Sequence, residues 1–241
     1  MELYRCDVTL HDYLFFTTTE RGKVAETGPF LHNYALTYAL GWANSPWRNE
    51  KQQPHYREEL AKVGQRYVTP AKLLRGSYVV NQYNTMSESY SLGKAQSIGY
   101  PDWGFIKCFR PGAIFRFYVI SAEVVQFPHY LRLGKFMAKA GIRALSARQI
   151  EQHIAGLNAS GKGTKLDQLI RPMLNWDDLE PSARPIIYDI ITSPLPSRLI
   201  DNPVFDGVSA PYLTANFAND ETPILLPLRM GYYGENLCGS W

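Results

Sequence analysis

The chain opens with a regular alternation of apolar and polar residues. Every second residue over residues 4–10 is apolar, namely Tyr4, Cys6, Val8 and Leu10. A period of two predicts a half-buried β-strand. Further on, Thr27 is a typical helix cap and Pro29 a typical first-turn residue, and apolar residues at near-helical spacing follow as far as Gly41. These signals predict a helix that starts near Thr27 and ends at Gly41.

The middle of the chain is typical of β-structure broken by glycine and proline. A short helix is predicted over residues 57–63. Residues 67–104 contain β-favouring runs interrupted by glycines, which predicts a long hairpin or insertion that projects from the sheet. Strands are predicted over residues 105–109 and 113–125, with a proline-glycine turn at residues 111–112. Both faces of the second strand are apolar, so we expect it to lie in the centre of a sheet.

The last third predicts a hairpin, a helix and short strands. Residues 131–145 resemble another hairpin. A capping-box pattern, Ser146 with Gln149, begins a predicted helix whose apolar face comprises Ile150, Ile154 and Leu157. The remainder is rich in proline, so it allows only short strands, near residues 186–191 and 224–229.

This order of elements predicts an α+β fold with a ferredoxin-like or RRM-like (RNA-recognition-motif) core. The core would span residues 1–160 and carry residues 67–104 as an inserted hairpin. Residues 161–241 would form a proline-rich C-terminal extension of short strands packed on the core. Several other α+β arrangements share this order of elements.

Positive charge is concentrated in the middle of the chain. Residues 61–148 hold 13 Lys and Arg against 3 Asp and Glu, whereas the whole chain has a net charge of only +3. The same stretch holds 14 aromatic residues. Cations neutralise phosphates and aromatic rings stack on unpaired bases, so the combination predicts a surface for single-stranded nucleic acid. The plain alternative is a solvated basic face, with most of the aromatic residues in the core.

The candidate RNA-binding residues come from several predicted hairpins rather than from one helix. That distribution favours a groove that follows a bent single strand over a helix inserted into duplex DNA. Arg116 and Arg132 can equally be structural, with their stems along apolar neighbours. The candidates are Lys72, Arg75, Tyr78, Lys94, Lys107, Arg110, Arg116, Arg132, Lys135, Lys139 and Arg143.

Composition argues against several classes of protein. No apolar run is long enough to span a bilayer, and the first residues lack the pattern of a secretory signal. Cys6, Cys108 and Cys238 are too far apart for a disulfide framework or a zinc site, which suits a reducing cytoplasm. Cys6 and Cys108 are expected to be small core residues on strands. The five histidines share no metal-binding spacing, so we expect no metal and no cofactor.

Two motifs suggest catalysis only superficially. Residues 156–162 nearly match a phosphate-binding loop, but Gly163 occupies the position of the required hydroxyl and a predicted helix precedes the loop. Nucleotide hydrolysis is therefore not expected. Asp177 and Asp178, with Glu180, could be paired carboxylates, but they precede Pro181 in a polar segment. Turn chemistry explains them better.

A metal-free ribonuclease is the enzyme alternative. It needs a base, an acid and a cation, and His32 with Tyr34 and a lysine of the middle segment could supply them. The competing interpretation is that His32 lies near a helix start, where it caps the helix or is exposed. We favour the second interpretation, because isolated histidines are common.

Three runs resemble one known family. They are residues 1–16 (MELYRCDVTLHDYLFF), 31–41 (LHNYALTYALG) and 131–139 (LRLGKFMAK). These runs are similar to the small subunit of type I-D CRISPR effector complexes. That subunit belongs to the repeat-associated RNA-binding (RAMP) superfamily and corresponds to the Cas-five-like member of Cascade. The resemblance covers the whole length, including the proline-rich C-terminal part.

The resemblance implies a ferredoxin-like core with an extended β-hairpin thumb, here residues 67–104. One copy would cap the effector complex and grip the 5′ handle of the CRISPR RNA. It would dock against the backbone and large subunits near the protospacer-adjacent motif, where target DNA is a further candidate partner. Carried onto this chain, Gly134, Lys135 and Lys139 are candidates to hold the RNA backbone.

The sequence therefore predicts a non-catalytic, cytoplasmic RNA-binding subunit of a CRISPR interference complex. Type I-D systems use a separate processing endonuclease, and this weakens the ribonuclease alternative, a metal-independent enzyme that processes precursor CRISPR RNA. A scaffold that contacts only protein, with its basic residues facing acidic neighbours, is the third hypothesis.

Overall fold

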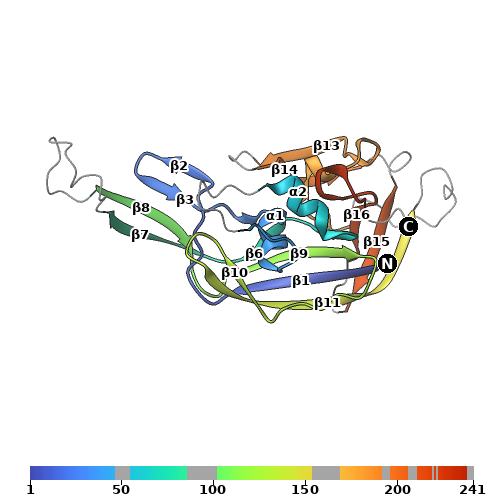
Figure 1. The fold of residues 1–241 in the computed structure, drawn as a ribbon, viewed down its shortest axis with the longest axis horizontal. Helices are drawn as coiled ribbons and strands as arrows, with labels where there is room; N and C mark the ends of the chain where they lie inside the picture. The colour runs from blue at the N-terminus through green and yellow to red at the C-terminus, as the bar shows by residue number, and fades with distance from the viewer. Residues whose placement is uncertain are drawn as a thin grey trace.

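A nine-stranded antiparallel sheet organises the chain in the computed structural model (Figure 1). The structure describes residues 1–46, 55–85, 102–153, 169–191, 196–205, 211–218, 220 and 222–237. The strand order is β16-β15-β11-β1-β9-β6-β4, with β10 paired to β11 and β5 paired to β9. The strands are β1 (Glu2–Leu10), β4 (Phe30–Leu31), β5 (Arg66–Val68), β6 (Ala71–Arg75), β9 (Ile114–Ser121), β10 (Tyr130–Leu133), β11 (Ala138–His153), β15 (Tyr212–Phe217) and β16 (Ile224–Pro227).

The two strands with the clearest apolar patterns lie in the middle of this sheet. β1 pairs with β9 on one side and with β11 on the other. β9 pairs with β1 and, along its other edge, with β5 and β6. The predicted strand over residues 4–10 and the predicted central strand after residue 113 are both confirmed. The predicted hairpin over residues 131–145 is also confirmed, since β10 pairs with the first part of β11.

The inner face of the sheet carries one apolar core. Cys6 and Val8 of β1 and Phe117 of β9 are fully buried there. Helix α1 (Asn33–Ala39) contributes Leu36 to the same core, and Leu40 follows at its end. The helix contacts both β10 and β5, so it bridges two parts of the curled sheet. Burial of these side chains removes apolar surface from water, the main favourable term in folding.

The outer face of the sheet is covered at one end by the C-terminal part of the chain. Leu3 of β1 and Ile120 of β9 are buried in a second core. Leu213 and Phe217 of β15 and Met230 beyond β16 belong to this second core. The predicted C-terminal strands near residues 186–191 and 224–229 are confirmed as β13 (Ile187–Ile191) and β16.

Two smaller sheets flank the main one. β14 (Leu199–Val204) lies between β12 (Leu174–Asn175) and β13. The second small sheet has the order β2-β3-β8-β7, and its strands are β2 (Thr19–Arg21), β3 (Val24–Glu26), β8 (Asp102–Phe109) and β7 (Tyr78–Thr85). β7 and β8 form a long hairpin that extends away from the main sheet (Figure 1).

The projecting hairpin is shorter at its start than the predicted residues 67–104. Residues 67–75 belong to β5 and β6, which pair with β9 in the main sheet. The hairpin begins only at Tyr78 and returns to Phe109. The β-favouring runs were therefore found, but their division between two sheets depends on partners distant in the sequence.

The predicted helix over residues 146–157 is wrong for its first eight residues. Ser146 continues β11 opposite Tyr4, and Ile150 lies opposite Ala215 of β15. Residues 154–157 lie outside the described residues. The capping-box pattern involves only residues that are close in the sequence. β11 pairs with β1 along one stretch and with β15 along the next, and this pairing outweighs the capping-box pattern.

Helix α1 also starts later than predicted. It begins at Asn33 with His32 as its cap, rather than near Thr27. Phe30 and Leu31 form β4 instead, because they pair with Lys72 and Ala71 of β6. Its end near Gly41 is confirmed, since Gly41 takes a positive φ of 76°. The predicted short helix over residues 57–63 is confirmed as α2 (Tyr56–Leu60), continued by the 3-10 turn η1 (Ala61–Val63).

The described part of the chain is thus mostly β, with short helices, and is compatible with the predicted α+β class. Over residues 146–153 the second helix of a ferredoxin-like core is replaced by a strand. The ferredoxin-like core therefore stays a prediction. None of the helices in the described ranges is long and apolar enough to cross a membrane.

Candidate nucleic-acid interface

Strand register places several of the candidate cations on the outer face of the main sheet. Asp7 of β1 lies opposite Arg116 on one side and opposite Arg143 on the other. Arg116 in turn lies opposite Lys72 of β6. Residues directly opposite each other in antiparallel strands point to the same face. Lys72, Arg116, Asp7 and Arg143 therefore form one row across four strands.

Two further rows extend this face toward β10. Arg75 lies opposite Ile114, Ile114 opposite Thr9, and Thr9 opposite Gly141. Lys139, two residues before Gly141, lies opposite Arg132 of β10. Six candidates thus share one face, which we call the basic face: Lys72, Arg75, Arg116, Arg132, Lys139 and Arg143.

Three of the candidate cations are already neutralised by carboxylates. Arg116 donates two hydrogen bonds to Asp7, of 2.7 Å from Nε and 2.9 Å from Nη2, and these raise the pKa of its guanidinium. Lys72 Nζ is 2.6 Å from Asp201 of β14. On the projecting hairpin, Lys107 Nζ is 3.3 Å from Glu26. The alternative that Arg116 is structural is therefore supported by its geometry.

The other candidate cations remain available to a ligand. Within the described residues, no carboxylate oxygen lies within 4 Å of the nitrogen atoms of these side chains. Arg75, Arg132 and Arg143 are also exposed. The available cations are Arg75, Arg110, Arg132, Lys135, Lys139 and Arg143. Lys94 lies outside the described residues.

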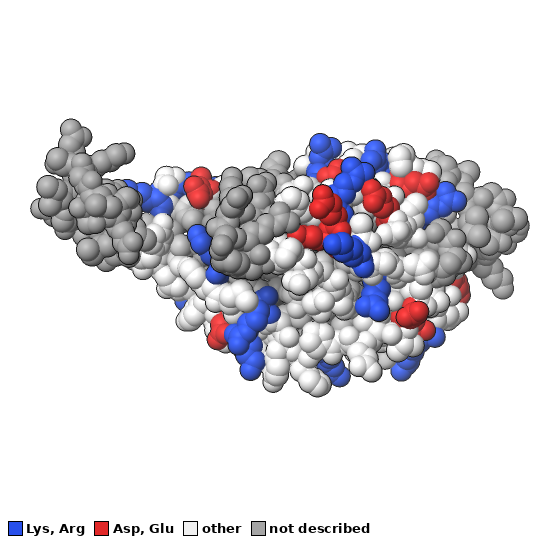
Figure 2. Space-filling model, in the orientation of Figure 1, with Lys and Arg blue, Asp and Glu red and all other residues white. Residues whose placement is uncertain are grey.

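Figure 2 shows how the charges lie on one side of the molecule. Lys and Arg side chains gather at the lower left, toward the β10 end of the main sheet, with few acidic neighbours. Along the top, over β13 and β14, basic and acidic side chains alternate. On this side of the molecule, the positive charge is thus least compensated near β10.

The candidates on the projecting hairpin are separate from the basic face. The ring centroids of Tyr78 and Phe109 lie 4.2 Å apart, and Lys107 Nζ lies 4.6 Å from the centroid of the Tyr78 ring. Both contacts hold the Tyr78 ring within the base of the hairpin, and burial raises the pKa of the Tyr78 hydroxyl. Arg110 follows β8 and is exposed. Tyr78 and Lys107 therefore stabilise the hairpin base and do not present an open stacking surface.

Gly134 has a conformational role in the β10–β11 turn. Its φ is 70°, and a Cβ atom there would lie 2.5 Å from the carbonyl oxygen of Phe15. The next residue, Lys135, donates its backbone N–H to the same oxygen at 2.8 Å. Only glycine fits this close approach without strain. Lys135 is exposed in this turn, directly after β10.

Sequence reasoning missed the exposed ring of this turn. Phe136 is 60% exposed, and it lies inside the basic run between Lys135 and Lys139. A large aromatic residue in a short basic turn was the signal that could have identified it.

His32 is not positioned as a catalytic base. Its Nδ1 accepts a hydrogen bond from the backbone N–H of Tyr34 at 3.2 Å, so it caps α1 as one interpretation predicted. Its Nε2 lies 2.9 Å from the hydroxyl of Ser197. Burial lowers its pKa to about 4, so the ring is neutral at pH 7. With 7% exposure it has little access to a substrate.

Asp178 is the residue that the sequence most clearly misjudged. It lies in the predicted turn, the 3-10 segment η4 (Trp176–Asp178), but it is fully buried. Its carboxylate accepts hydrogen bonds from Asn33 at 2.7 Å, Tyr34 at 2.9 Å, Tyr67 at 3.0 Å and the backbone N–H of Tyr233 at 2.9 Å. Burial raises its pKa to about 7. The network joins the C-terminal part to α1 and β5.

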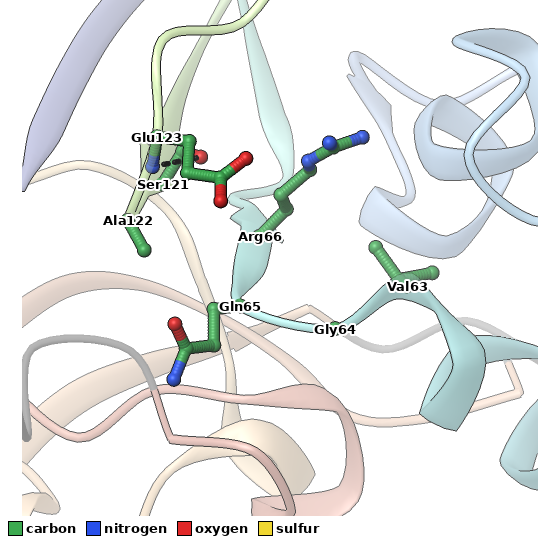
Figure 3. Close-up of a pocket in the computed structure, with 7 residues that line it drawn as sticks. All are labelled: Val63, Gly64, Gln65, Arg66, Ser121, Ala122 and Glu123. Carbon is green, nitrogen blue, oxygen red and sulfur yellow. Dashed lines mark hydrogen bonds between the residues drawn. The ribbon is translucent and has the colours of Figure 1, made fainter.

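A small surface pocket of about 220 Å³ lies elsewhere, between the η1–β5 connection and the end of β9 (Figure 3). Arg66 lies at this pocket, and its guanidinium is 5.7 Å from the ring centroid of Trp42. Glu123 lines the same space. None of the candidate cations lines it, so it is distinct from the basic face.

A comparison with protein families gives a match over nearly the whole chain. The family model of the type I-D CRISPR-associated protein Cas5/Csc1 matches residues 1–235. A search of the curated proteins finds no match. Because the model spans nearly the whole chain, the protein belongs to the type I-D CRISPR-associated Cas5/Csc1 family.

Proposed function

We propose that this chain is the RNA-binding subunit that holds the 5′ handle of the CRISPR RNA in a type I-D interference complex. The observation that carries the proposal is the basic face. Arg75, Arg132, Lys139 and Arg143 come from β6, β10 and β11, yet strand register brings them to one side of the sheet. Cations spread over neighbouring strands can follow the phosphates of a bent single strand.

The proposed role is positional and does not involve catalysis, a metal or a cofactor. The one histidine considered as a base is buried and engaged by Tyr34 and Ser197. Within the described residues, no group of three His, Cys, Asp or Glu side chains is placed to hold a metal ion. The basic face would fix one end of the RNA and leave its chemistry to other proteins.

Family membership supports the proposed partners. A type I-D Cas5-type subunit in a cytoplasmic defence complex would contact the backbone subunit and the large subunit as well as RNA. Target DNA near the protospacer-adjacent motif is the further candidate ligand. The exposed isoleucines of the β13 segment, Ile186, Ile187 and Ile190, are suitable for burial by a protein neighbour.

The salt dependence of RNA binding tests the role of the basic face. We expect Arg143→Gln to weaken binding of a single-stranded repeat RNA and to lower the salt slope by about 0.7, the value for one phosphate contact. Lys62→Gln is the control, because Lys62 is an exposed cation on η1 and is not one of the residues of the basic face. Fluorescence anisotropy from 50 to 300 mM salt gives both quantities. Equal effects of the two changes would contradict the proposal.

Incubation with precursor RNA separates this proposal from the ribonuclease alternative. In EDTA we expect the pure protein to bind the RNA and leave it uncut. Specific cleavage that disappears in His32→Ala would show that the chain is an enzyme.

A further inference from the structure

Phe136 has the geometry of a preformed stacking platform. Its ring is stacked on that of Phe15, with centroids 5.4 Å apart and an interplanar angle of 23°. Phe15 is only 4% exposed, whereas Phe136 is 60% exposed. The inner face of Phe136 is therefore supported by the core, and the rest of the ring is open to solvent. Exposed aromatic rings with one free face are the usual stacking partners of unpaired bases.

The backbone around this ring is fixed before any ligand binds. Lys135 donates its N–H to Phe15, which ties the turn to the segment that supports the ring. Arg132 Nη1 donates to the carbonyl oxygen of Met137 at 3.2 Å, across the same turn. Gly134 permits the close approach of the two segments. A ring held in this way loses little conformational freedom when it binds a ligand.

The charge around Phe136 favours a nucleotide over an apolar protein surface. Lys135 precedes the ring, and Arg132 and Lys139 lie opposite each other on the two strands of the hairpin. One carboxylate lies near the start of β11, because Asp12 accepts the backbone N–H of Lys139 at 2.9 Å. Cations beside an open aromatic ring match the phosphate and the base of one nucleotide.

Tyr130, the other exposed ring of this hairpin, is less suitable. The Nζ atom of Lys139 lies 4.0 Å from its centroid and covers one of its faces. The ring of His11 approaches its edge, with centroids 6.0 Å apart. Phe136 alone of these two rings combines a supported inner face with a free outer one.

We propose that Phe136 stacks on one unpaired base of the bound RNA, while Arg132 and Lys135 contact the adjacent phosphates. This inference rests on the proposed RNA-binding function and adds a contact between a ring and a base. Every base has a π-face, so the contact would select an unpaired, accessible position rather than a particular base.

A cycle of protein and RNA changes tests the contact. The full-length chain is titrated into a fluorescein-labelled 12-nucleotide single-stranded repeat RNA and into versions with an abasic site at each position. Phe136→Leu keeps an apolar side chain but removes the ring. We expect about a tenfold loss of affinity for the intact RNA, within the range for one stacked base. When the abasic site replaces the base that stacks on Phe136, the wild type and Phe136→Leu should bind the RNA with equal affinity.

Two further variants control for indirect effects. Phe136→Trp retains a ring and should keep the affinity. Met137→Ala removes another side chain that is 60% exposed from the same turn, but no ring, and should change the affinity less than about twofold. Circular dichroism confirms that each variant is folded.

The outcomes distinguish this inference from the function on which it rests. If wild type binds RNA with a normal salt slope but Phe136→Leu binds equally well, the stacking contact is wrong and RNA binding stands. A tenfold loss that persists at every abasic position also overturns the contact. If the wild-type chain binds none of these RNAs, both proposals fail. Unchanged RNA affinity with reduced capture of a neighbouring subunit would make Phe136 part of a protein interface instead.

Discussion

Asp178 shows most clearly how one residue can hold distant segments together. Both of its oxygen atoms accept hydrogen bonds from neutral donors, and none of these donors is a cation. Burial favours the protonated acid, whereas the four donors favour the carboxylate. Burial has the larger effect, and the pKa rises to about 7.

Asp178→Asn should therefore be destabilising at neutral pH. An amide nitrogen replaces one oxygen, and its N–H donors would face the Asn33 amide if it replaces Oδ2 or the Tyr233 N–H if it replaces Oδ1. A buried donor without an acceptor costs about 1–3 kcal/mol. Urea denaturation measures the change in free energy of unfolding. The control is Asp177→Asn, because Asp177 is exposed and accepts one backbone N–H, from Arg198.

The wild type and Asp178→Asn also give a test of the pH dependence of stability. The folded-state pKa of Asp178 is above its unfolded value, so the folded state binds a proton more tightly. The stability of the wild type relative to Asp178→Asn should rise as pH falls from 7.5 to 5.5, by about 2 kcal/mol. A difference that stays constant or shrinks over this window would contradict the raised pKa.

Gly134 provides a second residue-scale prediction. Gly134→Ala should destabilise the protein by about 2 kcal/mol or more, because it combines a positive φ with a contact to the Phe15 carbonyl. Gly112→Ala separates the two effects, since Gly112 has a φ of 86° but nothing within 4 Å of the added Cβ. Thermal unfolding should show the larger loss for Gly134→Ala. Equal losses would mean that the contact with Phe15 is unimportant.

At the scale of elements, local patterns predicted strands better than helices. The alternation over residues 4–10 and the two apolar faces of β9 require burial on known sides, and both strands formed as expected. The helix signals at Ser146 and Thr27 each depend on only a few residues that are close in the sequence. They gave way where a strand elsewhere in the chain supplied pairing partners. Such partners cannot be read from a single local pattern.

The join between β1 and the C-terminal part is a testable connection between elements. Arg5 of β1 forms an ion pair with Asp220, between β15 and β16, and these side chains are 8% and 15% exposed. Asp220→Asn removes the carboxylate that accepts from Arg5, whose Nε also lies 4.0 Å from Asp7, and this loss should cost about 3 kcal/mol. Glu235→Gln is the control, because it breaks the exposed pair with Arg57, where less than about 1 kcal/mol is expected. Chemical denaturation measures both. Similar losses would indicate that the Arg5–Asp220 pair is not structural.

At the scale of the whole molecule, charge density along the chain predicted a set of cations, of which six lie on the basic face and Lys107 and Arg110 lie apart from it. The sequence also suggested that Arg116 could be structural. It could not show that Asp7, Asp201 and Glu26 neutralise Arg116, Lys72 and Lys107, because these partners are distant in the chain. The exposure of Phe136 depends equally on the geometry of a turn. The neutralised candidates form ion pairs between strands, namely β9 with β1, β6 with β14 and β8 with β3. The available cations and the exposed ring form the proposed interface.

The central claim is that one RNA strand lies on the basic face. Crosslinking of 4-thiouridine-labelled guide RNA in the assembled complex, followed by mass spectrometry, tests it most directly. We expect adducts in residues 130–143, with a further site near Arg75. Adducts on this chain that avoid both regions, or none at all, would contradict the account.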